Sequence, residues 1–126
     1  MDESLQVVLE NISTSAEWRE RSFVGDLEER GEWSYSEYWR LELALYCLAI
    51  SAPERELYAA IFKVFVRLSQ LISAHLDADD VFVIKHMTRV EVLSLQERVG
   101  LVFQGVFEGR MPERKQLFPR NPWLTD

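Results

Sequence analysis

The sequence predicts an all-α fold: a single-domain bundle of five to six helices with an extended C-terminal tail packed on it. Apolar residues recur at steps of three and four in several long segments, which is the spacing of one helix face. Hydroxyl residues that can cap a helix stand before these segments. No alternating strand pattern recurs. With 126 residues, 48% of them hydrophobic, the chain has the size and apolar content of one domain, so we expect a single domain over 1–126.

The N-terminal part is the least regular. Apolar spacing over 5–12 predicts a first helix, which the three hydroxyl residues that follow would end. A second helix is predicted over 15–30, with Phe23 and Leu27 facing inward. Gly31 is its predicted stop, because glycine readily adopts the left-handed conformation that closes many helices.

Three long helices are predicted after residue 34. Each begins with a Ser or Thr that can accept a backbone N–H of the first turn, and a Glu three residues later that can reach back. The three pairs are Ser34 with Glu37, Ser51 with Glu54, and Thr88 with Glu91. The first helix is apolar almost all round over 43–50 and is therefore predicted to be central. Pro53 stands near the first turn of the second of these helices. Gly109 is expected to close the third helix, and Gly100, inside it, is expected to mark close packing against a neighbouring helix.

Two segments leave alternatives open. The β-branched residues of 81–87 suit a strand, whereas the acids just before them suit a helix N-terminus. We expect a short helix there, because a lone strand would have no partner. Over 110–126, three prolines forbid a continuous helix. We expect this tail to dock on the bundle in an extended form through Leu117, Phe118, Trp123 and Leu124. Disorder is the alternative and would leave the two aromatic rings exposed.

Charge and composition exclude several classes of protein. The 21 acidic and 14 basic residues give a net charge of −7, so we expect no direct binding of nucleic acid. The one cysteine, Cys47, can form neither an internal disulfide nor a cysteine zinc site, and its apolar neighbourhood predicts burial. The first residues lack the pattern of a secretory signal, and no run of 18 apolar residues occurs. We therefore expect a cytoplasmic chain that does not enter a membrane.

No pattern predicts catalysis, a cofactor or a metal. The segment 75–80 contains His75 and three aspartates, but it lacks the glycine and the later glutamate of a calcium loop. Helix capping explains these acids without a metal. His86 has no second histidine at helical spacing, and no nucleophile elbow or glycine-rich phosphate loop occurs. We predict no catalytic, cofactor-binding or metal-binding residue. A small helical enzyme or ligand-binding bundle with a pocket near Cys47, His75 or His86 is kept as an alternative.

The most unusual segment interleaves acids with aromatic residues. Residues 1–42 hold 11 acids and four arginines and supply the whole acid excess. Within them, a loop is expected at 31–34, between a helix stop and a helix cap. Trp and Tyr contribute buried area at protein interfaces, and carboxylates pair with Lys and Arg of a partner. The predicted protein-binding residues are Asp26, Glu28, Glu29, Glu32, Trp33, Tyr35 and Glu37.

A structural reading of the same residues stays open. Tyr38 and Trp39 begin a helix and would then belong to the core, and Trp33 would fasten the loop to that helix. The acidic residues would then form a solvated face that keeps the protein soluble.

Three segments carry a resemblance to a known class of proteins. They are the loop Gly31-Glu32-Trp33-Ser34, the helix start Tyr38-Trp39-Arg40-Leu41-Glu42, and the tail Pro119-Arg120-Asn121-Pro122-Trp123. With its length, acidity and lack of a catalytic set, the chain resembles the small acidic immunity proteins of bacterial toxin systems, including contact-dependent growth inhibition. The resemblance implies a cytoplasmic protein that binds and neutralises a cognate toxin domain, often a nuclease.

Electrostatics favours the same reading. An acidic helical surface could occupy the basic cleft of a nuclease, or dock beside it, and opposite charges raise association rates by roughly 10- to 1,000-fold. The alternative is a non-enzymatic adaptor or regulatory helical module that acts as a homodimer. The sequence leaves open the toxin's reaction and the oligomeric state.

Overall fold

Five helices account for the regular structure of the computed structural model, which describes residues 2–51 and 54–124. The elements are α1 (Glu3–Glu10), α2 (Phe23–Arg30), α3 (Tyr35–Ile50), α4 (Arg55–Leu76), α5 (Arg89–Glu108) and a 3-10 turn at Arg114–Gln116. No strand occurs in the described ranges, so the all-α prediction is confirmed.

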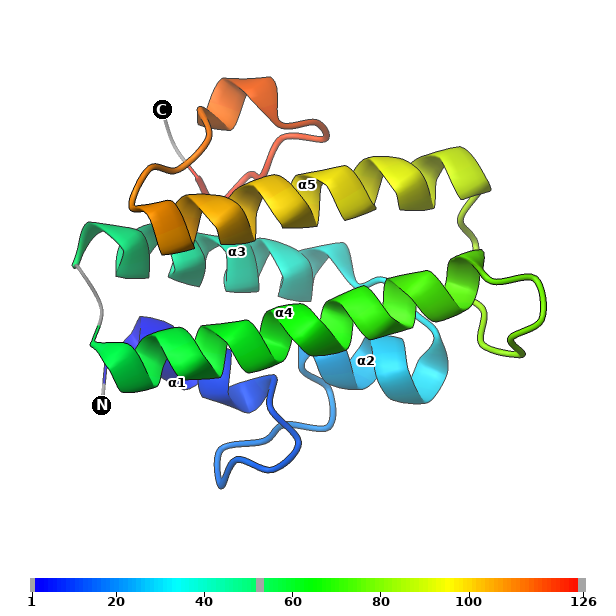
Figure 1. Cartoon of the computed structure of the whole chain (residues 1–126), viewed down its shortest axis with the longest axis horizontal. Coiled ribbons are helices and arrows are strands. Elements are labelled where there is room, and N and C mark those ends of the chain that lie inside the picture. The colour runs from blue at the N-terminus through cyan, green and yellow to red at the C-terminus, as the bar shows by residue number, and fades with distance from the viewer. Residues whose placement is uncertain (1, 52–53, 125–126) are drawn as a thin grey trace.

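The helices form a bundle in which α3 is central. Figure 1 shows α4 and α5 running antiparallel across the near face, with α3 behind them. On its other sides α3 contacts α1 and α2, and both of these also pack on α4. Half of the α3 residues are buried, and they meet buried side chains of α5 such as Val102 and Phe103. The predicted central position of the helix after Ser34 is therefore confirmed.

The second helix is shorter than predicted, because α2 begins at Phe23 rather than at residue 15. The Ser22 hydroxyl accepts the N–H of Gly25 at 3.1 Å, which caps the first turn. A Cβ at Gly25 would lie 2.2 Å from the Glu20 carbonyl oxygen, so the preceding chain crosses directly over the helix start and cannot continue it. At the other end Gly31, with φ of 64°, closes α2 as predicted.

Of the three predicted capping pairs, the one at Thr88 forms completely and the one at Ser34 forms only through the serine hydroxyl. The Ser34 hydroxyl accepts the N–H of Glu37 at 3.4 Å, and Thr88 with Glu91 makes a complete capping box. Gly109, with φ of 74°, ends α5 as predicted.

The predicted cap at Ser51 is wrong. The Ser51 hydroxyl donates to the Leu48 carbonyl at 2.8 Å and so closes α3 instead of opening α4. Glu54 precedes α4 without a side-chain capping bond. Pro53 lies outside the described residues.

The segment 81–87 is neither the expected short helix nor a strand. Its backbone N–H groups bond outside any regular element: Ile84 donates to Nδ1 of His75 at 2.8 Å, and Lys85 donates to the Gly31 carbonyl at 2.7 Å. The Ile84 side chain is buried. Contacts with the end of α4 and with the α2–α3 turn therefore replace helix formation.

The C-terminal tail docks through two of the four apolar side chains expected to do so. Leu117 and Leu124 are buried, whereas Phe118 and Trp123 are 70% and 47% exposed, so the predicted docking of both aromatic rings is wrong. The tail bends through a 3-10 turn, and the Tyr46 hydroxyl of α3 donates to the Pro112 carbonyl at 2.7 Å.

The helix α4 is long and strongly apolar. It is long and apolar enough to cross a membrane by length and composition alone, a test that core helices of soluble proteins also pass. Only 28% of its most apolar stretch is buried in the structure. Its exposed large apolar side chains are Phe62 and Val66.

Candidate protein-binding site

Two shallow hollows flank the turn between α2 and α3, and we call them together the Trp33-loop surface. The first, of about 600 Å³, is lined by Asp26, Glu37, residues 19–21, Ser34 and Ser36. The second, of about 430 Å³, is lined by Arg21, Asp26, residues 32–35, residues 85–87 and Glu91. Five of the seven predicted site residues border these hollows: Asp26, Glu32, Trp33, Tyr35 and Glu37. Glu28 borders a different hollow, beside Arg67 of α4, and Glu29 is exposed on α2.

The turn that carries this surface is held on both sides. The left-handed Gly31 accepts the Lys85 N–H, and a Cβ at Gly31 would lie 2.4 Å from the Val83 carbonyl oxygen. The N–H of Glu32 donates to the Asp26 carbonyl at 3.2 Å. Only glycine fits this close approach, so the backbone fixes where Glu32 stands.

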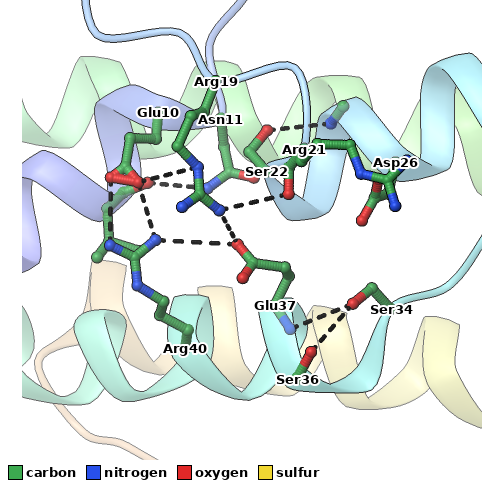
Figure 2. A network of polar contacts seen from close by, with 12 residues as sticks. Glu10, Asn11, Arg19, Arg21, Ser22, Asp26, Ser34, Ser36, Glu37 and Arg40 are labelled. Carbon is green, nitrogen blue, oxygen red and sulfur yellow. Dashed lines mark hydrogen bonds and ion pairs between the residues drawn. The ribbon is translucent and has the colours of Figure 1, made fainter.

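An arginine-rich network extends from the first hollow, where Arg19 and Glu37 lie, to Glu10 and Arg40 (Figure 2). Arg40 binds Glu10 with two hydrogen bonds of 2.8 and 3.2 Å, and Arg19 lies 3.6 Å from the same carboxylate. Arg19 also forms an ion pair with Glu37. Burial would raise the pKa of Glu10, but the hydrogen bonds and charge of Arg40 and the charge of Arg19 outweigh it and leave that pKa below its ordinary value. The negative charge of Glu37 is likewise already balanced by Arg19 of the same chain.

Two further predicted carboxylates also have partners of their own. Asp26 is buried and lies between Arg21 at 3.2 Å and Arg30 at 3.4 Å. Glu28 pairs with Arg67 at 2.8 Å.

Glu29 and Glu32 are the two predicted carboxylates that remain exposed. No cation in the described part of the chain lies within ion-pair distance of either. The uniformly available acidic face expected from the sequence is thus reduced to these two charges.

Trp33 belongs to the core. It is 8% exposed, and its ring lies 4.8 Å from that of Phe23 and 5.3 Å from that of Tyr38. Its indole Nε1 is buried without a hydrogen-bond partner. This burial contradicts the prediction that Trp33 offers an exposed anchor and agrees with the structural alternative. Tyr38 and Trp39 are buried as well.

Tyr35 keeps a half-buried position at the edge of the second hollow. Its ring lies 5.2 Å from that of Trp39. Burial and the nearby charge of Glu91 raise the pKa of Tyr35, against the opposing charge of Arg98. The hydroxyl therefore stays protonated at neutral pH and can donate a hydrogen bond to a partner.

Sequence reasoning missed a buried ion pair between α3 and α5. Arg98 binds both oxygens of Glu42, at 2.8 and 3.0 Å, and the Tyr38 hydroxyl donates to Glu42 at 3.1 Å. Arg98 also donates to the Pro119 carbonyl, and the Asn121 amide donates to Glu42 at 3.0 Å, so the pair holds the tail. The sequence did contain a signal for this pair, because Glu42 and Arg98 are opposite charges at core-facing positions of two predicted helices.

The remaining candidates for chemistry have ordinary structural positions. Cys47 is exposed, which corrects its predicted burial: the outward-facing side of α3 turns it to solvent. Nδ1 of His75 accepts the N–H of Ile84. Within the described ranges, no three His, Cys, Asp or Glu side chains lie close enough to hold a metal ion. No protein-family model, curated protein or solved structure matches this chain.

Proposed function

We propose that this protein acts by binding and that it neutralises a basic protein partner of the toxin class, as the resemblance to immunity proteins implies. One observation carries the proposal: Glu29 and Glu32 are exposed, unpaired carboxylates on either side of a turn that the fold holds in place. A binding group that is already positioned loses little conformational freedom when its partner arrives.

The neighbouring charges support a basic partner. Five carboxylates and three basic side chains border the Trp33-loop surface, so its own balance is acidic. Asp26 and Glu37 form ion pairs with arginines of the chain. Glu20, Glu32 and Glu91, with Glu29 nearby, are then left to attract Lys or Arg of a partner, and Glu29 and Glu32 stand at the fixed turn. The proposed contact residues are therefore Glu29, Glu32 and Tyr35.

The chain's own internal groups give no support to catalysis. Glu10, Asp26, Glu42 and Arg98 are the buried charged residues of the described chain, and each is engaged in an ion pair. Of these four residues only Asp26 borders the hollows, and its carboxylate is paired with Arg21 and Arg30. We propose a non-enzymatic inhibitor whose action depends on surface complementarity.

The experiment measures binding to a basic nuclease toxin domain encoded beside this chain. Glu29→Lys with Glu32→Lys should weaken the dissociation constant by at least about tenfold, because two attractive charges become repulsive. The control is Glu54→Lys with Asp79→Lys, which changes the net charge equally at two exposed positions away from the turn. Isothermal titration calorimetry gives both constants.

Two results would contradict the proposal. A folded Glu29→Lys, Glu32→Lys variant that binds as tightly as the natural chain removes this surface from the interface. Equal weakening in the control variant would assign the effect to net charge rather than to the turn.

A further inference from the structure

An apolar surface on α4 and α5 is distinct from the Trp33-loop surface. Phe62 on α4 is 54% exposed, and Leu101 and Phe107 on α5 are 45% and 39% exposed. They border a groove of about 620 Å³ whose lining also includes Phe65 and Phe103. We call these five residues, with Gly100 between them, the α4–α5 face.

Aromatic contacts across the two helices build this face. The ring of Phe107 lies 6.3 Å from that of Phe62 and 5.9 Å from that of Tyr58. One turn further along, Phe65 and Phe103 lie 5.3 Å apart. These pairs fix the relative height of the two antiparallel helices, which Figure 1 shows side by side.

A notch lies in the middle of the face. No atom lies within 4 Å of the position that a Cβ would take at Gly100, and this residue lines the groove. The glycine weakens the helix and serves no close contact inside the chain, which corrects the expected packing role. An incoming side chain could fill the space that it leaves.

The groove is lined mainly by apolar side chains, with Gln96, Glu97 and Gln104 as its polar residues. Contiguous exposed apolar patches on soluble proteins mark places where another molecule binds. The outward side of α4 extends the apolar stripe one turn further with Val66, which is 36% exposed.

We propose that a second copy of this chain covers the α4–α5 face. The helices have 22 and 20 residues, so each is roughly 30 Å long. Side by side their outward sides cover roughly 600 Å² per copy, apolar and polar residues together, which is the lower limit of about 600 Å² per partner for a specific interface. The inference is independent of toxin binding, because it uses none of the residues assigned to that surface.

The charges beside the face are self-complementary. Lys63 follows Phe62 on α4 and is exposed, whereas Glu108 follows Phe107 on α5 and is exposed. A twofold axis parallel to the helices places α4 of one copy on α5 of the other. Because Phe62 and Phe107 stand at similar heights, Lys63 of one copy then meets Glu108 of its partner, twice per dimer.

Sedimentation equilibrium of the full chain tests the proposal. The natural chain should show twice the monomer mass of 14.8 kDa at micromolar concentrations. Phe62→Glu and Leu101→Glu should each give monomers with unchanged helical circular dichroism, because both side chains are exposed. The control Val81→Glu, at a 98% exposed position off the face, should remain dimeric.

Exchanging the charges of Lys63 and Glu108 tests how the two copies are aligned. It also tests the dimer if Phe62→Glu or Leu101→Glu fails to fold. Lys63→Glu alone and Glu108→Lys alone should each weaken the dimer by about tenfold or more, and the two together should restore it. A natural chain that stays monomeric overturns the proposal, as does a dimer that survives both Phe62→Glu and Leu101→Glu. Failure of the double exchange to restore the dimer overturns the twofold arrangement. A monomer that floats with phospholipid vesicles would assign the face to a membrane instead.

Discussion

Glu42 and Arg98 form an ion pair inside the core, where each charge depends on the other. The Glu42 side chain is fully buried and that of Arg98 is 4% exposed. Burial and the charge of Glu42 also raise the pKa of Tyr38 well above its ordinary value, although Arg98 opposes the rise. The pair joins α3, α5 and the tail. It thereby fixes how these elements are positioned relative to one another, which apolar packing alone would not specify.

Removing one member of this pair should destabilise the protein strongly. Arg98→Met leaves a buried carboxylate without its cation and should lower the free energy of unfolding by about 3–5 kcal/mol, as measured by urea unfolding. The double variant Glu42→Gln, Arg98→Met removes both charges, and the single Gln oxygen can still accept from either Tyr38 or Asn121, which donate to different oxygens of Glu42. It should be more stable than Arg98→Met alone. A double variant as unstable as the single one would show that lost packing, rather than the orphaned charge, dominates.

Glu10 should make stability depend on acid pH. Its pKa is lowered in the fold by Arg40 and Arg19 despite the opposing effect of burial. Ionised Glu10 therefore stabilises the fold at neutral pH, and this contribution is lost as pH falls below the ordinary value of 4.5 and through the lowered pKa. Glu10→Gln should be less stable than the natural chain at neutral pH and show a flatter fall in acid. Urea unfolding over a pH series measures both; parallel pH curves would refute the assignment.

Sequence patterning could predict which residues of the candidate site were unusual, but not their pairing. Asp26, Glu32, Trp33, Tyr35 and Glu37 do gather at two adjoining hollows. Ion pairs that cross between segments depend on the folded arrangement, and nothing in local spacing indicates them. The burial of Trp33 likewise depends on rings from two other elements.

At the scale of elements, helices with a clear apolar stripe were predictable and their connections were not. The stripe over 57–76 and the cap at Thr88 predict α4 and α5 well, since both signals are local. The start of α2 depends on a side chain from elsewhere: the Asn11 amide oxygen accepts the N–H of Val24 at 2.9 Å. The segment 81–87 takes its shape from His75 and Gly31. Such tertiary contacts override local propensity.

Gly100 provides a prediction for α5. Gly100→Ala should raise the free energy of unfolding by about 0.5–1 kcal/mol, because alanine is the better helix former and its methyl group has open space. Urea unfolding in a Leu101→Glu background, where dimer formation does not contribute, measures the monomer alone. A lower stability of Gly100→Ala would mean that the notch is filled within the monomer.

At the scale of the whole molecule, an acid excess is a poor guide to an acidic binding face. The net charge of −7 lies mainly in the first third of the chain, yet several of those carboxylates bind arginines of the same chain. What the fold leaves exposed at the α2–α3 turn is Glu29 and Glu32. The proposed dimer face uses other residues, so a dimer would carry two copies of the surface proposed to bind a toxin.

The most direct measurement of the binding claim is the association rate with the basic nuclease domain at increasing ionic strength, followed by stopped-flow fluorescence. If Glu29 and Glu32 steer the partner, the rate should fall steeply with salt, and Glu29→Gln with Glu32→Gln should remove most of that dependence and slow association at low salt. A rate and a salt dependence that are the same for both proteins would contradict the account.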